Sequence, residues 1–247
     1  MASHQYVYVM NRLSKAWPGG KEVLKNISLS FLPGAKIGVL GLNGAGKSTI
    51  FAMIAGLIAA DRGSVTLDGQ GLAGLPLEMR ARLGLGYLAQ DTTIFRGMTV
   101  EENLRVPLEA MGLGVNERNS RLAEALAEFE LEPLRQEPGQ TLSGGERRRV
   151  EMARALILDP KVMLLDEPFG ALDPVTRDSL QTEFKSLQRK LGFTAVMVTH
   201  DMAEALLLAD QIAVMKEGLL VRIGTPAELL ADPGNDYVAA LLETPRR

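Results

Sequence analysis

The chain has 247 residues, of which 46% are hydrophobic and 23% charged, as expected of a globular protein with a sizeable core. Its 27 lysine and arginine residues against 30 aspartate and glutamate residues give a net charge of −3, so no nucleic-acid partner is expected. The absence of cysteine excludes disulfide bonds, thiol catalysis and cysteine-ligated metals, and it allows a cytoplasmic location.

The apolar stretches are too short to cross a membrane. The longest, residues 50–60, falls below the roughly 18 residues that a spanning helix needs, and the N-terminus shows no secretory signal pattern. Any work at a membrane is therefore expected to take place from one side of it.

The first part of the chain predicts a layer of β-strands. Residues 6–10 and 27–31 have strand patterns, and residues 65–68 alternate and end in Asp-Gly, which is typical of a hairpin. Trp17, the only tryptophan, lies in a Pro-Gly-Gly turn between the first two strands. Its ring either stacks on an adenine or covers the sheet edge, and the pattern leaves both interpretations open.

Residues 41–49 match G-x-x-x-x-G-K-[ST], the phosphate-binding loop of nucleotide-hydrolysing proteins. An apolar run at residues 36–40 predicts a buried strand before the loop, and residues 50–56 predict a helix after it. The alternative is a glycine-rich turn that only joins a strand to a helix.

The chemistry of phosphate binding explains this sequence of residues. Glycines let the backbone turn tightly and point successive N–H groups at phosphate oxygens. Lys47 is expected to reach the β- and γ-phosphates of ATP, and the Ser48 hydroxyl to ligate Mg²⁺. The candidate nucleotide-binding residues of the loop are Gly41, Asn43, Gly44, Ala45, Gly46, Lys47, Ser48 and Thr49.

The apolar period becomes helical in the middle of the chain. Between residues 99 and 134, Leu122, Ala125, Leu126 and Phe129 follow i, i+3, i+4, i+7 spacing. We expect a helical insertion at about residues 92–160, whose last helix covers residues 146–158.

Polar groups follow the predicted parallel strands at residues 85–88, 162–165 and 194–199. They are Gln90, Asp166 with Glu167, and His200, and ligands bind at the carboxyl edge of such sheets.

Asp166 is expected to hold Mg²⁺ and Glu167 to act as general base; the alternative is that two carboxylates solubilise a loop. His200 is expected to contact the γ-phosphate or the attacking water, although a lone histidine is more often a structural hydrogen-bonder. Gln90 carries the weakest signal on its own.

Residues 143–145, Ser-Gly-Gly, predict a second anion-binding turn at the start of a helix. The arginines at residues 147–149 that follow either steer phosphate or form a solvated helix face, and the solvated face is favoured because consecutive helical residues point in different directions. Asp173 before Pro174 predicts a helix N-cap.

Together these motifs resemble the ATP-binding-cassette (ABC) family across nearly the whole chain. Residues 142–146, Leu-Ser-Gly-Gly-Glu, are similar to its signature motif, although glutamate replaces the commoner glutamine, and residues 162–167 resemble its Walker B strand. Asp173 resembles the family's D-loop aspartate, Gln90 its Q-loop and His200 its H-loop, and Trp17 falls where the family places its adenine-stacking aromatic residue.

The resemblance implies a P-loop NTPase of α/β fold class, with a mainly parallel core sheet, an N-terminal antiparallel β layer and a helical subdomain, forming one domain over residues 1–247. It implies that ATP and Mg²⁺ are bound between two copies in a head-to-tail dimer. Ser143, Gly144, Gly145 and Asp173 then act on the partner's nucleotide, while Gln90 also helps to hold Mg²⁺.

Different stretches resemble different branches of the family. Residues 6–48 are similar to translational-throttle proteins, residues 85–90 and 142–151 to the lipopolysaccharide-transport ATPase, and residues 169–242 to osmoprotectant importer ATPases. Either the chain is a mosaic, reconstructed or designed cassette, or it is one natural transport ATPase.

The expected function is ATP hydrolysis for transport through separate membrane subunits, with the chain in the cytoplasm or on the inner face of the membrane. The alternatives are a soluble, ribosome-remodelling ATPase and an engineered or ancestral cassette without a permease.

Overall fold

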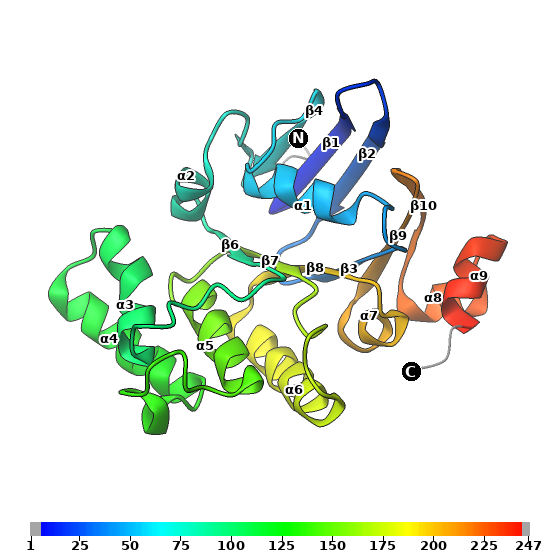
Figure 1. Cartoon of the computed structure of the whole chain (residues 1–247). Helices are drawn as coiled ribbons and strands as arrows, with labels where there is room; N and C mark the ends of the chain where they lie inside the picture. Colours follow the sequence, from blue (N-terminus) through cyan, green and yellow to red (C-terminus); the bar gives the residue numbers. More distant parts are fainter. Residues whose placement is uncertain (1–5, 244–247) are drawn as a thin grey trace.

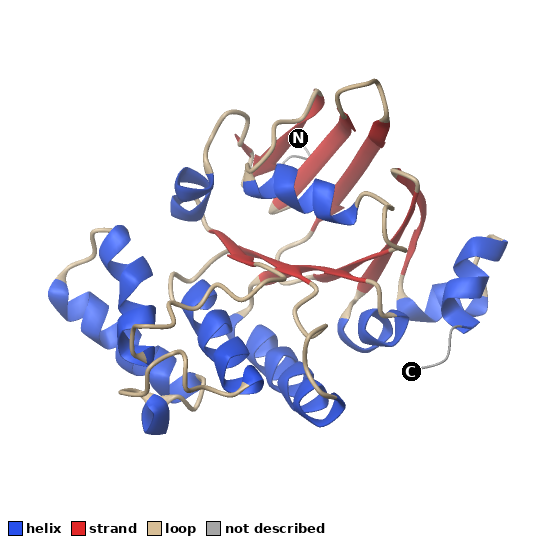
Figure 2. Ribbon diagram, in the orientation of Figure 1, coloured by secondary structure: helices blue, strands red, loops and turns tan. Residues whose placement is uncertain are grey.

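The structure is a computed structural model that describes residues 6–243, and it consists of two sheets with helices between and below them (Figures 1 and 2). The larger sheet has six strands, and only β10 runs antiparallel to its neighbour. In spatial order its strands are β10 (Leu219–Gly224), β9 (Gln211–Lys216), β3 (Lys36–Leu40), β8 (Thr194–Thr199), β7 (Val162–Asp166) and β6 (Leu85–Leu88). This is the predicted mainly parallel core.

The smaller sheet is antiparallel and is built from the start of the chain. Its strands, in spatial order, are β2 (Glu22–Phe31), β1 (Tyr8–Ala16), β4 (Arg62–Leu67) and β5 (Gln70–Gly71). Helix α1 (Lys47–Ala55) lies between the two sheets (Figure 1). Buried side chains of both sheets and of α1 form one apolar cluster, so the helix is held by packing on both sides.

The remaining helices cover the opposite face and the ends of the larger sheet (Figure 2). Below the sheet lie α5 (Gly144–Leu156), α6 (Pro174–Leu191) and α7 (Met202–Leu208), and at the β6 end lie α2 (Leu77–Arg82), α3 (Val100–Ala110), α4 (Val115–Glu128) and the 3-10 turn η1 (Glu132–Leu134). Helices α8 (Pro226–Ala231) and α9 (Asp236–Glu243) lie beside β10. The strands β7 and β8 are buried along their whole length because helices cover both faces.

Several predicted element boundaries were wrong, and for two of them the structure shows a local reason. Helix α5 begins at Gly144 rather than Glu146, because Ser143 caps it and shares a capping box with Glu146. The first strand runs to Ala16 rather than ending at Met10, because register shifts after Met10 interrupt its alternating pattern.

In the part of the chain that the structure describes, no helix is both long enough and apolar enough to span a bilayer.

Candidate functional site

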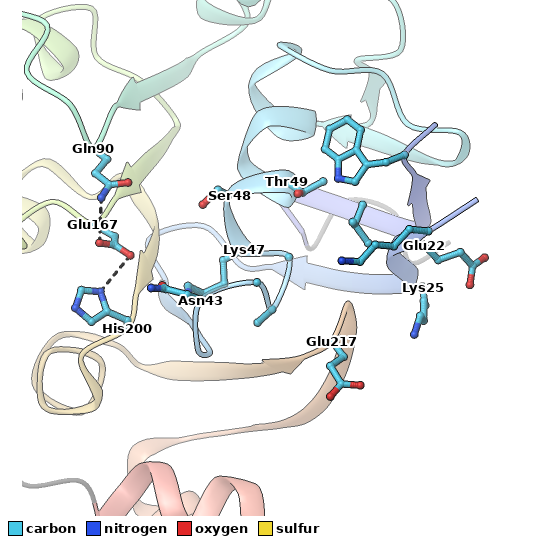
Figure 3. Close-up of a pocket in the computed structure, with 16 residues that line it drawn as sticks. Glu22, Lys25, Asn43, Lys47, Ser48, Thr49, Gln90, Glu167, His200 and Glu217 are labelled. Carbon is cyan, nitrogen blue, oxygen red and sulfur yellow. Dashed lines mark hydrogen bonds and ion pairs between the residues drawn. The ribbon is translucent and has the colours of Figure 1, made fainter. Parts of the chain in front are cut away.

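A cleft of about 810 Å³ opens at the carboxyl edge of the larger sheet, which is a typical size for a small-molecule site (Figure 3). Its walls come from the Trp17 turn, strand β2 and the phosphate loop on one side and from the ends of β6, β7 and β8 on the other. The residues that line it from the predicted set are Trp17, Asn43, Gly44, Ala45, Gly46, Lys47, Ser48, Thr49, Gln90, Glu167 and His200. Most of the predicted site residues therefore meet in one cleft.

The phosphate loop needs its glycines for two different reasons. Gly44 and Gly46 have φ angles of 84° and 98°, in the left-handed region that other residues rarely adopt. Gly41 has an ordinary φ, but a Cβ there would lie 2.5 Å from the Met215 carbonyl oxygen. Gly46 is also the N-cap of α1, and no side chain caps this helix end. The loop thus presents a helix N-terminus without a side-chain acceptor, as anion binding requires.

Lys47 lies in the first turn of α1 and is buried. Its ammonium group donates to the carbonyl oxygen of Gly41 and, at 3.3 Å, to that of Leu42. Burial lowers the pKa of Lys47, and the nearby carboxylates of Glu167 and Asp166 oppose that shift. The lysine is therefore a cation held at the base of the cleft by carbonyl dipoles.

Three side chains from three strand ends form a hydrogen-bonded group in the cleft (Figure 3). One carboxylate oxygen of Glu167 lies 3.1 Å from His200 Nδ1, and the other accepts a 3.3 Å hydrogen bond from the Gln90 amide. Glu167 is mostly covered, with 16% of its side chain exposed, whereas 55% of the His200 side chain is exposed. The carboxylate is held from two sides and faces the phosphate loop.

Asp166 lies one residue earlier, at the end of β7, and is buried. Within the described chain its Oδ1 has no hydrogen-bond partner. Burial and the neighbouring Glu167 raise the pKa of Asp166, and Lys47 counteracts part of that rise. A buried, unpaired carboxylate oxygen beside a phosphate loop is the kind of atom that a cation would satisfy.

Trp17 lines the cleft, and 42% of the residue is exposed. Its place in the lining of the cleft, together with the phosphate loop, is the position that stacking on a ligand would require.

The signature residues lie elsewhere. Within the described residues, Ser143, Gly144, Gly145 and Asp173 do not line the cleft. Ser143 caps α5 and Asp173 caps α6, where its carboxylate accepts a 3.1 Å bond from Thr176 N. Hydrogen bonds from Thr176 lower the pKa of Asp173. One chain alone does not bring these residues to its own phosphate loop.

A family model described as ABC transporter matches residues 24–170 of the chain. The chain belongs to the ABC transporter ATP-binding family. Members of this family are P-loop ATPases, so the chain is an ATPase, and the expected fold and enzyme class are confirmed.

Individual relatives support the same family. The chain is 41% identical to the lipopolysaccharide export ATP-binding protein LptB of Escherichia coli K12, over 89% of this chain and 91% of LptB. It is 40% identical to the glycine betaine/carnitine/choline transport ATP-binding protein OpuCA of Bacillus subtilis, over 93% of this chain and 60% of OpuCA. CbiO1 of Clostridium perfringens, part of the ABC transporter complex CbiONQ, superposes with a TM-score of 0.85 at 30% identity, covering 93% and 92% of the two chains.

These comparisons do not show a mosaic origin for this ABC ATPase. Single natural proteins align with about nine-tenths of the chain, including both of the branches that its middle and C-terminal stretches resemble.

One pair of residues beside the cleft of this ABC ATPase was not predicted from the sequence. The sequence favours a solvated face for the three arginines after the signature, but Arg148 is buried and pairs with the buried Glu151 at 3.0 Å. Only Arg147 and Arg149 are partly exposed. The available signal was a charged pair at i, i+3 spacing among the apolar residues of a helix.

Proposed function

We propose that the chain binds Mg-ATP in this cleft and hydrolyses it to drive transport through separate membrane subunits. The observation that carries the proposal is the position of Glu167, held between Gln90 and His200 and facing the phosphate loop across one cleft. The family and its named relatives support transport as the use of the energy.

The phosphate loop supplies binding and charge. The N–H groups at the start of α1 and the positive end of its dipole stabilise phosphate oxygens. Lys47 exchanges its two carbonyl acceptors for the β- and γ-phosphates, which are stronger acceptors for a cation. Trp17 stacks on the adenine ring at the open end of the cleft.

The residues present fit a magnesium ion that arrives with the nucleotide. Among residues 6–243, no group of three or more His, Cys, Asp and Glu side chains is placed to hold a metal, so phosphate oxygens and water would complete its coordination. Ser48, Gln90 and Asp166 would hold the ion, Asp166 through its unpaired Oδ1. When bound, the ion neutralises charge on the transferred phosphoryl group.

Glu167 acts as the general base for the attacking water. Its carboxylate is available because both of its contacts are to neutral or weakly basic donors rather than to a permanent cation. His200 fixes the carboxylate and, being exposed, also faces the γ-phosphate position. Because Gln90 is hydrogen-bonded to Glu167, a change in the position of the Glu167 carboxylate would also move the loop that carries Gln90.

A second copy of the chain completes the site. Since Ser143, Gly144, Gly145 and Asp173 lie outside the cleft of their own chain, a head-to-tail partner would bring them to the nucleotide. ATP then favours the closed dimer because it contacts both copies.

A membrane subunit is expected to dock beside the Gln90 loop, with the chain on the cytoplasmic face of the membrane. A groove of about 230 Å³ lies there between the loop, α3 and α5, and its lining includes Phe95, Pro107 and Arg154. Phe95 is 44% exposed. An exposed aromatic residue in a groove is a common anchor site for a partner.

The test is ATP hydrolysis by the purified chain and by Glu167→Gln, an isosteric change that removes the base. We expect turnover to fall about 10²–10⁴-fold while ATP binding persists and an ATP-bound dimer accumulates on size exclusion. Wild-type turnover in the variant would rule out the role of Glu167.

Co-expression with candidate permeases tests the transport assignment, with Phe95→Asp as the docking variant. The wild type should co-purify with a permease and the variant should not.

The mosaic origin stays a hypothesis. Separate searches with the three stretches decide it, because one natural sequence that matches all three best would exclude a mosaic. A mosaic without a cognate permease is expected to bind ATP yet hydrolyse it slowly.

A further inference from the structure

The buried pair Arg148 and Glu151 lies on one functional segment, helix α5, and contacts two others. Both residues lie on α5, the helix that Ser143 caps, and their side chains are 8% and 3% exposed. Arg148 Nε donates to the Pro168 carbonyl at 2.6 Å, and its Nη1 donates to the Ala89 carbonyl at 2.9 Å. Pro168 directly follows Glu167, and Ala89 directly precedes Gln90.

Glu151 holds the other side of the Gln90 loop. One of its oxygens accepts hydrogen bonds from the Thr92 hydroxyl at 2.6 Å and from the Thr93 N–H at 2.7 Å. Its other oxygen pairs with Arg148 Nη1 at 3.0 Å. The Gln90 loop is therefore fixed before and after Gln90 by the same ion pair.

This arrangement sets the distance between two proposed functional side chains. The Gln90 amide and the Glu167 carboxylate are 3.3 Å apart, a long hydrogen bond that small backbone shifts would break. The guanidinium joins the backbone carbonyls adjacent to both residues, and its rigid planar fork restricts how the two carbonyls lie relative to each other. A lysine has no such fork.

We propose that Arg148, oriented by Glu151, is a positioning residue that holds Gln90 and Glu167 in hydrolytic geometry from the signature helix. A rotation of α5, such as engagement of Ser143 by a second copy would cause, then moves both loops together. The inference rests on the proposed function, because it assigns Arg148 an effect through Glu167.

If Arg148 and Glu151 had only a structural role, their substitution would have a different effect. It would lower the stability of the fold and leave the chemistry of the folded protein unchanged. A positioning pair lowers kcat in the folded protein while nucleotide affinity stays, since none of its atoms lines the cleft. A fall in kcat without a change in nucleotide affinity therefore distinguishes a positioning role from a purely structural one.

The experiment compares Arg148→Met, Arg148→Lys and Glu151→Gln in the full chain. Arg149→Met is the matched control, because Arg149 is the next residue on α5 and makes a similar forked pair, with Glu183 at 2.8 and 3.1 Å, away from both loops. ATP turnover, the Kd for ADP and hydrogen exchange of the peptides covering residues 89–95 and 167–170 are measured for each.

We expect Arg148→Met and Arg148→Lys to lower kcat about 10- to 100-fold, with the Kd for ADP changed by less than about threefold. Exchange should accelerate in both peptides, whereas Arg149→Met should leave kcat and both peptides near wild type. In Glu151→Gln, the peptide covering residues 89–95 should respond most, because that is where Glu151 binds. This isosteric variant keeps the test decisive if Arg148→Met does not fold.

Unchanged kcat in folded Arg148 variants overturns the proposal, as does an equal loss in Arg149→Met. A wild type that hydrolyses no ATP would refute the proposed function instead, and the exchange measurements would still decide whether Arg148 holds both loops.

Discussion

Arg80 anchors the far end of the helix that carries the phosphate loop, and its loss should destabilise the chain strongly. The residue lies on α2, is 6% exposed, and donates to four backbone carbonyls at 2.6–2.9 Å. Two of these carbonyls, Met53 and Ile54, belong to the last turn of α1, and Leu72 and Leu75 belong to the segment before α2. The guanidinium thus joins α1 to that segment.

The size of the effect follows from these contacts. Four hydrogen bonds at a net value of about 1 kcal/mol each sum to about 4 kcal/mol. The cation also complements the negative end of the α1 dipole, while the burial that lowers the pKa of Arg80 opposes part of the gain. A loss of about 4 kcal/mol is a large share of the 5–15 kcal/mol typical of a folded domain, and it corresponds to about 8–16 °C in Tm at this chain length.

The assay is thermal and urea unfolding of Arg80→Met beside Arg82→Met. Arg82 lies on the same helix, is exposed, and makes one bond to the Ala110 carbonyl at 2.9 Å, so its loss should change Tm by only a few degrees. ATP at 100 times its Kd should add about 2.7 kcal/mol to the folded state of wild type and Arg80→Met alike, so the Tm of both should rise while the difference between them persists. Equal Tm values for the two variants would refute the reasoning.

Three further outcomes follow from the structure. Lys47→Ala should weaken ATP binding by at least about tenfold, because it removes the buried cation of the phosphate loop; unchanged affinity by calorimetry would contradict this. Tyr237→Phe removes a hydroxyl that accepts from Leu42 N at 3.3 Å and donates to the Met215 carbonyl at 3.2 Å, so nucleotide affinity should fall about fivefold, and an unaltered Kd would refute that link. Hydrogen bonds from Arg135 and Arg105 lower the pKa of Glu101 from 4.5 to about 2, so its contribution to stability is present above pH 4.5 and lost as the pH falls towards 2. Glu101→Gln should therefore be less stable than wild type at neutral pH, and the difference in unfolding free energy should shrink in acid; a constant difference across that range would be evidence against the shift.

The local patterns of the sequence predicted the cleft well. The phosphate loop, Gln90, Glu167 and His200 each stand directly after a strand, and parallel strands bring their carboxyl ends to one edge. That inference needs only the strand assignments, because the parallel arrangement of the strands brings these residues close together. The packing that fixes the angles between these groups could not be obtained in the same way.

Arg148 shows why. A charged residue on a helix is usually solvated, and three consecutive arginines point in three directions, so the sequence favours an exposed face. Whether one of the three arginines is buried depends on how α5 packs against the Gln90 loop. This is a tertiary contact that the local sequence does not specify. Ser143 was missed as a helix cap for a related reason, since Gly144 and Gly145 are poor helix formers and suggest a turn.

The backbone of Glu167 adopts a conformation that is unfavourable for a residue with a side chain. Its φ of 42° lies in the left-handed region, which glycine adopts readily but which costs a residue with a side chain about 1–3 kcal/mol in backbone strain. Two contacts hold the strained residue: its N–H donates to the Val198 carbonyl at 2.9 Å, and Arg148 binds the next carbonyl, that of Pro168. Glycine would relieve the strain and remove the carboxylate that meets Gln90 and His200, so the strain is explained by the position of that carboxylate. The surrounding contacts, rather than the conformational preference of glutamate, determine the position of the proposed base.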